Sequence, residues 1–156
     1  MLKFKTVEEI LRFALDKEKW SCGFYCDLSK AVNDPIAQGV FTALAREEAR
    51  HISAIEVEIF KMGYTLKSEE DDLLSPESKS QRTLDEDTRN MTFLDAIQLA
   101  LSKEQTAFRL FMELMTMTEN QEVRGVLMEL AKEEMRHVIR LEEEYNTFAS
   151  KRGHSS

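Results

Sequence analysis

The sequence predicts an all-α protein in which two helical hairpins, joined by a long crossover, form a four-helix bundle. Three observations predict this fold class. The chain has 156 residues but only 5 glycines and 2 prolines, a composition that suits long helices and leaves little for strands. Its apolar residues recur at helical spacing. The second half of the chain also repeats the first at a constant offset that places Thr6 on Thr92.

The first two helices have local start and stop signals. Thr6 followed by Glu9 is a capping box, so a first helix is expected to begin near residue 6. Asp34 can cap a second helix that has Pro35 at its first position. Gly63 is typical of the residue that follows a helix, so this second helix is expected to end near residue 62.

The second half of the chain is expected to form the second hairpin. A polar, charged and aperiodic segment precedes it, which indicates a crossover linker. A third helix is predicted from near Thr92, and a fourth from near Asn120 to about Phe148. The expected layout is one domain over 1–150, with a hairpin at 6–62, a crossover at 63–91 and a hairpin at 92–148, followed by a disordered tail at 151–156.

Two pairs of motifs make the repeat specific. The stretch ALDKE at 14–18 matches ALSKE at 100–104, and AREEARH at 45–51 matches AKEEMRH at 131–137. The match needs no gap. Two similar hairpins joined by a crossover predict a bundle with pseudo-twofold symmetry.

Each half of the repeat places two glutamates and one histidine on helix faces that are otherwise mostly apolar. In each Glu-x-x-His pair the two side chains point the same way, because residues three apart share a helix face. Four unpaired carboxylates in a core would each cost several kcal/mol, whereas two divalent cations would neutralise them. The sequence therefore predicts a dinuclear metal site whose ligands are Glu18, Glu48, His51, Glu104, Glu134 and His137.

The alternative from the residues alone is a helical interaction protein that keeps this pattern without metal. One Glu-x-x-His pair would be a weak sign of metal binding, because glutamate is common in this chain. Two pairs, each preceded by a glutamate at the same distance, are far more specific. We therefore favour the dinuclear site.

Residues beside the predicted ligands are assigned simpler roles. Tyr25 lies two turns after Glu18 on the same face, so its hydroxyl can bond a ligand carboxylate, and it is the candidate catalytic residue. Glu47 is expected in solvent, paired with Arg50, and its repeat counterpart Glu133 likewise with Arg136. The two cysteines, Cys22 and Cys26, are expected to be small residues on the core side of the first helix. The alternative for Cys22, which is one turn from Glu18, is a redox-sensitive thiol beside the site.

Charge and hydropathy exclude several classes of partner. The formal net charge of −8 argues against nucleic acid and against an anionic membrane. No apolar stretch is long enough to span a membrane, and the N-terminal segment lacks the apolar run of a secretory signal. Two cysteines cannot form a disulfide framework. A cytoplasmic location is the expectation.

Four stretches of the sequence carry a family resemblance: KEKWSCGFY (17–25), EEARH (47–51), KEQTAFRLF (103–111) and EEMRH (133–137). They resemble the rubrerythrin-like branch of the ferritin-like superfamily, and the resemblance covers nearly all of the chain outside the linker and the tail. It implies a ferritin-like bundle with a non-haem centre of two iron ions, for which manganese or zinc are substitutes, held by the six ligands named above. Many relatives reduce hydrogen peroxide with electrons from an outside donor.

The sequence also departs from the family in two ways. Typical rubrerythrins carry a rubredoxin-like domain with four cysteines, whereas this sequence has 2. They also have a further glutamate three residues after the ligand of the third helix, where this chain has Ala107. The resulting site resembles the symmetric one of bacterioferritin-type proteins.

Two functions follow from the resemblance. The first is a di-iron oxidoreductase, expected as a homodimer, that reduces hydrogen peroxide or dioxygen with an external electron donor. The second is an iron-binding ferroxidase that serves iron storage or delivery.

Overall fold

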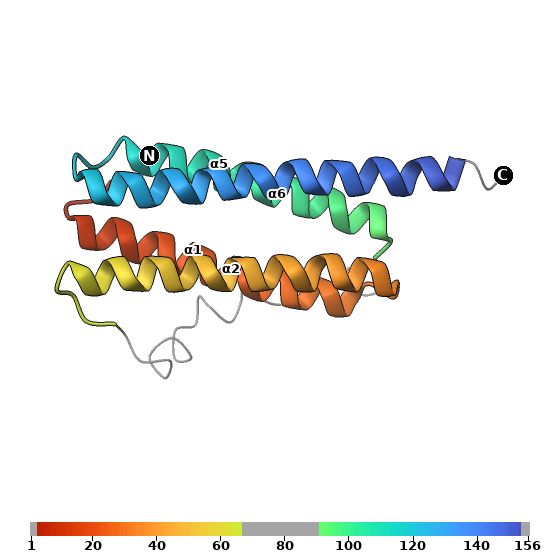
Figure 1. Ribbon diagram of the computed structural model, residues 1–156, viewed down its shortest axis with the longest axis horizontal. Coiled ribbons are helices and arrows are strands. Elements are labelled where there is room, and N and C mark those ends of the chain that lie inside the picture. The colour runs from red at the N-terminus through yellow and green to blue at the C-terminus, as the bar shows by residue number, and fades with distance from the viewer. Residues whose placement is uncertain (1–2, 67–90, 154–156) are drawn as a thin grey trace.

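The computed structural model describes residues 3–66 and 91–153, which form four long helices without a strand (Figure 1). The all-α four-helix architecture predicted from the sequence is confirmed. The crossover linker predicted at 63–91 lies largely outside the described residues. The helices are α1 (Val7–Ala31), α2 (Pro35–Lys61), α5 (Phe93–Met115) and α6 (Gln121–Gly153).

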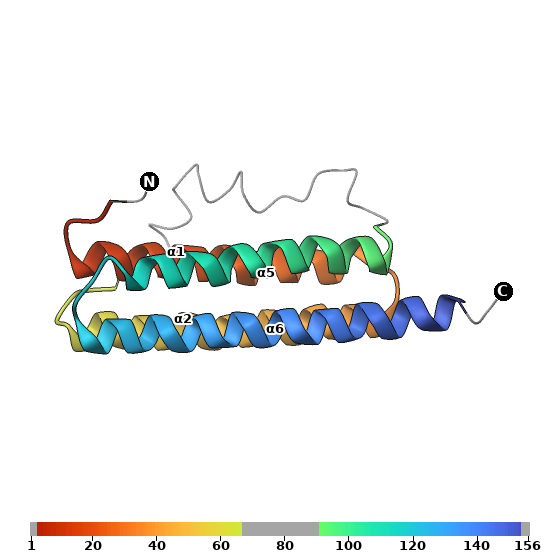
Figure 2. The same cartoon turned by 90° about the horizontal axis from the view of Figure 1, so that it is seen from above.

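The helices pair as two antiparallel hairpins that lie side by side. Helix α1 packs along α2, and α5 packs along α6. Figures 1 and 2 show that α1 and α6 run in one direction while α2 and α5 run in the other. Across the bundle, α2 faces α6 and α1 faces α5. No helix among the described residues combines the length and the apolar character needed to cross a membrane.

The predicted caps form as hydrogen bonds. The backbone N–H of Glu9 donates to Oγ1 of Thr6, and that of Asp95 donates to Oγ1 of Thr92, each at 3.2 Å. Oδ1 of Asp34 accepts from the backbone N–H groups at the start of α2. Gly63, with a φ of 84°, follows the end of α2 in the left-handed conformation that glycine adopts without strain.

The end of the fourth helix differs from the prediction. Helix α6 continues past Phe148 to Gly153, so residues 151–153 are helical and not part of a disordered tail. The ring of Phe148 packs edge-on against Phe93, with 4.8 Å between the centroids. This contact anchors the last turns of α6 on the start of α5. Residues 154–156 lie outside the described part of the chain.

Two apolar clusters fill the bundle, one toward each end. The first includes Phe24, Phe41, Phe93 and Leu141. The second includes residues from the opposite ends of the same helices, among them Leu11, Ile59, Phe111 and Leu127. Between the two clusters, the middle of the bundle contains buried charged residues. This polar layer is the only part of the described core where several carboxylates meet.

Candidate metal centre

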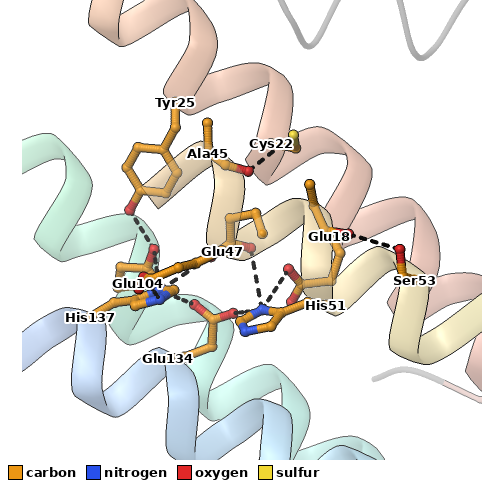
Figure 3. Close-up of polar contacts among 12 residues, drawn as sticks. Glu18, Cys22, Tyr25, Ala45, Glu47, His51, Ser53, Glu104, Glu134 and His137 are labelled. Carbon is orange, nitrogen blue, oxygen red and sulfur yellow. Dashed lines mark hydrogen bonds and ion pairs between the residues drawn. The ribbon is translucent and has the colours of Figure 1, made fainter. Parts of the chain in front are cut away.

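The six predicted ligands are all buried in the polar layer. Figure 3 labels all of them except Glu48. Each helix contributes at least one of them, and none is more than 8% exposed. Their placement follows from helical spacing: in α2 and in α6, the glutamate and the histidine three residues later share the face that meets the opposite hairpin. The structure therefore brings together the full set that the sequence analysis proposed: Glu18, Glu48, His51, Glu104, Glu134 and His137.

The first half of the site surrounds His51. Its Nδ1 lies 3.4 Å from Oε2 of Glu18 and 3.8 Å from Oε2 of Glu48, the residue one turn earlier in the same helix. The same nitrogen lies 3.4 Å from Oε1 of Glu134 on the other hairpin. Three residues of the first hairpin and one of the second thus form this half.

The second half surrounds His137 in the same way. Its Nδ1 lies 3.2 Å from Oε1 of Glu48 and 3.5 Å from both Oε1 of Glu104 and Oε2 of Glu134. The imidazole rings of His51 and His137 are nearly parallel, with 5.7 Å between their centroids. Because Glu48 and Glu134 each direct one oxygen to each histidine, they link the two halves.

The donor atoms fit two metal ions. In each half, ligand atoms from three glutamates and one histidine lie within 4.8 Å of one another. Both carboxylate oxygens of Glu48 and of Glu134 are buried without a hydrogen-bond partner among the described residues, and so is Nδ1 of His137. Buried polar atoms are normally satisfied, so this cluster of unpaired polar atoms is unusual unless a cation binds there. Oxygen and imidazole nitrogen donors suit iron, manganese and zinc.

The carboxylates of the layer titrate differently from one another. Burial raises the pKa of Glu18 well above its usual value, and the nearby Glu48 carboxylate adds to this effect. Burial likewise raises the pKa of Glu134. Burial acts on Glu48 too, but the ammonium of Lys103 and contacts with Glu18 and His137 together outweigh it and lower that pKa. The layer can thus hold protonated and charged carboxyl groups side by side.

The pKa of His137 moves in the opposite direction to the one burial favours. Burial alone would lower it, but the carboxylates of Glu104, Glu134 and Glu48 stabilise the imidazolium and raise the pKa to about 12. For Glu104, contacts with Glu134 and His137 outweigh burial and lower the pKa. Without a metal ion, protonated His137 therefore provides part of the positive charge that the carboxylates require.

Tyr25 occupies the position that the sequence analysis gave it. Its hydroxyl is fully buried and donates a hydrogen bond to Oε1 of Glu104, a predicted ligand on the other hairpin. Burial, reinforced by the Glu104 carboxylate, raises the pKa of Tyr25 well above its usual value, so the hydroxyl keeps its proton. The repeat counterpart, Phe111, is a buried apolar residue, and the two halves of the site differ at this point.

Lys103 is a member of the polar layer that the sequence analysis did not identify. Its Nζ lies 3.1 Å from Oε1 of Glu104 and 3.9 Å from Oε1 of Glu48, and its side chain is only 8% exposed. Glu48 and Glu104 raise its pKa despite burial, so the amine stays protonated. The repeat gives no signal for this role, because the counterpart Lys17 is exposed on α1.

Glu47 lies next to the site, and the prediction that it pairs with Arg50 in solvent is wrong. Its Oε2 is 2.8 Å from Nε2 of His137, the ring nitrogen opposite the one that faces the glutamates. A carboxylate at that nitrogen fixes which way a ligand imidazole points. The signal that could have found it is the repeated Glu-Glu pair, which precedes both histidines.

Two further predictions near the site have different outcomes. Glu133 forms the expected ion pair with Arg136. Of the two cysteines, Cys22 is partly buried and donates a hydrogen bond to the carbonyl oxygen of Ala45. Cys26 is exposed, so its assignment to the core side of α1 is wrong.

The comparison with known families matches this arrangement. The model of a family described as Rubrerythrin matches residues 9–145. The chain belongs to the rubrerythrin family. The matched residues include all six predicted ligands, Tyr25 and Lys103. The resemblance stated from the sequence is thereby confirmed. No curated protein matches this rubrerythrin-family chain.

Solved structures with a similar fold include ferritin-like proteins. A two-domain protein of Anabaena variabilis with DJ-1/ThiJ/PfpI-like and ferritin-like domains has a TM-score of 0.77 at 21% identity, over 90% of this chain. This chain spans only 39% of that protein. A hypothetical protein of Methanococcus jannaschii has a TM-score of 0.76 at 17% identity, over 96% of this chain and 87% of its own.

A third structure is the dodecameric thioferritin of Bacteroides fragilis, a bacterioferritin-related protein. Its TM-score is 0.73 at 18% identity, over 95% of this chain and 88% of its own. At such identities the likeness shows the fold alone. It confirms that the four-helix bundle is ferritin-like.

Proposed function

We propose that this rubrerythrin-family chain is a di-iron oxidoreductase that reduces hydrogen peroxide, or dioxygen, with electrons from an external donor. The observation that carries the proposal is the pair of four-residue groups, buried and linked by Glu48 and Glu134. Such a set can hold two ions close together, which is the arrangement that di-iron carboxylate bundles use. When bound, the two iron ions would supply the two electrons that reduce an O–O bond.

The protein residues would orient the ligands and exclude water. Glu18 and His51 would hold one ion and Glu104 and His137 the other. The hydroxyl of Tyr25, which is fully buried, holds Glu104 in place through its hydrogen bond. The apolar clusters on both sides of the polar layer limit access of water along the bundle axis. Reduction of peroxide to water also consumes two protons, which must come from solvent.

The second candidate is a ferroxidase that handles iron for storage or delivery, with ferrous ion as its substrate. The observation that favours it is Ala107, which stands where typical rubrerythrins have a further glutamate and packs against the apolar cluster in this chain. The site therefore keeps a symmetric set of four glutamates and two histidines. The size of the assembly separates the two candidates. Iron storage needs a large hollow assembly, and the thioferritin with a similar fold is dodecameric, whereas a peroxidase needs no more than a dimer.

Metal content and reaction with oxidants together test both candidates. Protein purified without chelator and then loaded anaerobically with ferrous ion should bind about two ions per chain. Rapid-mixing absorbance should then show faster oxidation by hydrogen peroxide than by dioxygen, with turnover that stops unless a donor is added. Glu48→Ala should lose metal, and Glu143→Ala, on the exposed face of α6, should not.

The contrary outcomes separate the candidates. Absence of bound metal at saturating concentration would rule out both. Faster oxidation by dioxygen, followed by growth of ferric mineral in a large assembly, would replace the peroxidase by iron storage. Light scattering of the same sample gives the size of the assembly, for which we propose a homodimer.

A further inference from the structure

Lys103 breaks the symmetry of the polar layer. Its ammonium approaches Glu104 and Glu48, and it also lies over the ring of Tyr25, 4.8 Å from the centroid. The counterpart in the repeat, Lys17, is exposed and lies over Phe13 instead. Among the residues that the structure describes, a lysine therefore lies only in the half of the site around His137.

The ammonium of Lys103 uses the same oxygens that would bind an ion at His137. Oε1 of Glu48 is 3.2 Å from Nδ1 of His137 and 3.9 Å from Nζ of Lys103. Oε1 of Glu104 is 3.5 Å from Nδ1 of His137 and 3.1 Å from Nζ of Lys103. A divalent ion placed among these atoms would meet the ammonium at close range and be repelled by it.

Charge balance also indicates that the ammonium of Lys103 and an ion at the His137 position exclude each other. Two divalent ions neutralise the four glutamates among the predicted ligands, so in a fully loaded layer Glu48 and Glu104 have no net negative charge left to pair with Lys103. An unpaired ammonium in a buried layer is strongly unfavourable. Its neighbours Ser102 and Gln105 are exposed, so rotation of the long side chain can carry the ammonium to solvent while its carbon chain stays packed on α5.

We propose that Lys103 is an internal counter-ion that makes the two metal positions unequal. The first ion binds at the His51 position, and the second binds at the His137 position only when the ammonium of Lys103 moves out to solvent. This inference rests on the proposed dinuclear site. It adds an order of binding and a lower affinity for one of the two positions.

Calorimetric titration of apo protein with Co²⁺ tests the order. The wild type should bind in two separable steps. Lys103→Gln should raise the affinity of the weaker step on the order of tenfold, the scale on which groups beside metal ligands act, and leave the stronger step unchanged. Lys103→Arg keeps the charge and should keep the two steps apart. Lys17→Gln, at the repeat-related position, should bind as the wild type does.

Chemical labelling of amines tests the movement of Lys103 without any variant. Wild-type protein, apo or saturated with Zn²⁺, is treated briefly with an acylating reagent and digested, and the peptides are quantified by mass spectrometry. Lys103 should react slowly in the apo protein and at least several-fold faster in the saturated protein, on the scale expected when a buried amine becomes exposed. Labelling of Lys17 should not change.

The outcomes separate this inference from the proposed function. A wild type that binds no Co²⁺ would overturn the dinuclear site itself. Two ions bound with affinities that Lys103→Gln leaves unchanged would overturn the role of Lys103 alone. If the glutamine variant does not fold, which circular dichroism reveals, the labelling result decides: equal reactivity of Lys103 with and without Zn²⁺ would refute the movement.

Discussion

The hydroxyl of Tyr25 connects a residue of one hairpin to a predicted ligand of the other. Tyr25→Phe removes the donor to Glu104 and should lower the free energy of unfolding of the apo protein by about 1.5–3 kcal/mol, the range for a hydrogen bond to a charged group. Metal stoichiometry should stay the same, and oxidation by peroxide should slow. Urea unfolding, metal analysis and rapid mixing measure the three effects. A variant that loses metal would show that Tyr25 holds the site together rather than orienting one ligand.

Glu47 should affect metal affinity although it is not among the predicted ligands. Because its carboxylate lies at Nε2 of His137, Glu47→Ala leaves that imidazole free to rotate and should weaken metal binding by about 10–100-fold. Glu48→Ala removes a ligand shared by both halves and should abolish binding of at least one ion. Titration of both variants beside Glu143→Ala provides the comparison. If Glu47→Ala binds metal with wild-type affinity, the carboxylate of Glu47 does not orient the imidazole of His137.

The convergence of the six candidate ligands could be predicted from the sequence because it depends only on helical spacing and on the repeat. Lys103 and Glu47 could not be placed in this way. Lys103 is adjacent to a ligand, but spacing does not decide whether a long flexible side chain turns inward or outward, as Lys17 shows. Glu47 points toward the opposite hairpin, so its partner depends on how the hairpins pack.

At the level of the helices, the N-terminus of α2 depends on one side chain. Oδ1 of Asp34 accepts hydrogen bonds from the backbone N–H groups of Ile36 and Ala37, at 2.7 and 3.3 Å. Asp34→Ala should lower the free energy of unfolding by about 1 kcal/mol, and Asp34→Ser should recover most of it. Metal stoichiometry should not change. Thermal unfolding monitored by circular dichroism measures the loss, and an unchanged melting temperature would contradict the role of the cap.

Helix starts were predicted more accurately than the last helix end. Each start has a capping residue, and a cap is a local feature that a sequence displays directly. The end of α6 lacks a comparable signal near Phe148, because the following residues favour helix as well as coil. The contact between Phe148 and Phe93 decides in favour of helix, and it is a contact between distant parts of the chain.

For the molecule as a whole, the polar layer makes the apo and the metal-loaded proteins respond oppositely to pH. The pKa of His137 is raised to about 12 by folding, so its contribution to stability is complete below pH 6.5 and is lost as pH rises toward 12. Folding also raises the pKa of Glu18, so its contribution to stability is likewise lost as pH rises. Between about pH 7 and about pH 9 the apo protein should lose about 1 kcal/mol per pH unit.

Metal binding should reverse this trend. Ligands bind metal in their deprotonated forms, so the affinity rises with pH and the stabilisation by bound metal rises with it. Urea unfolding of apo and Zn²⁺-loaded protein at several pH values checks both slopes. An apo protein that becomes more stable toward pH 9 would show that the layer does not bind extra protons on folding.

The sharing of candidate ligands between the hairpins fits an origin by gene duplication. Each hairpin carries two glutamates and one histidine, and each four-residue group takes three of its members from one hairpin and one from the other. An ancestral gene for a single hairpin would therefore have encoded a complete centre once two copies of its product associated. Duplication and fusion of that gene would free each copy to change on its own. The replacement that distinguishes the two halves is Tyr25 opposite Phe111. Lys103 and Lys17 are the same residue type, and they differ because Lys103 turns into the polar layer whereas Lys17 is exposed.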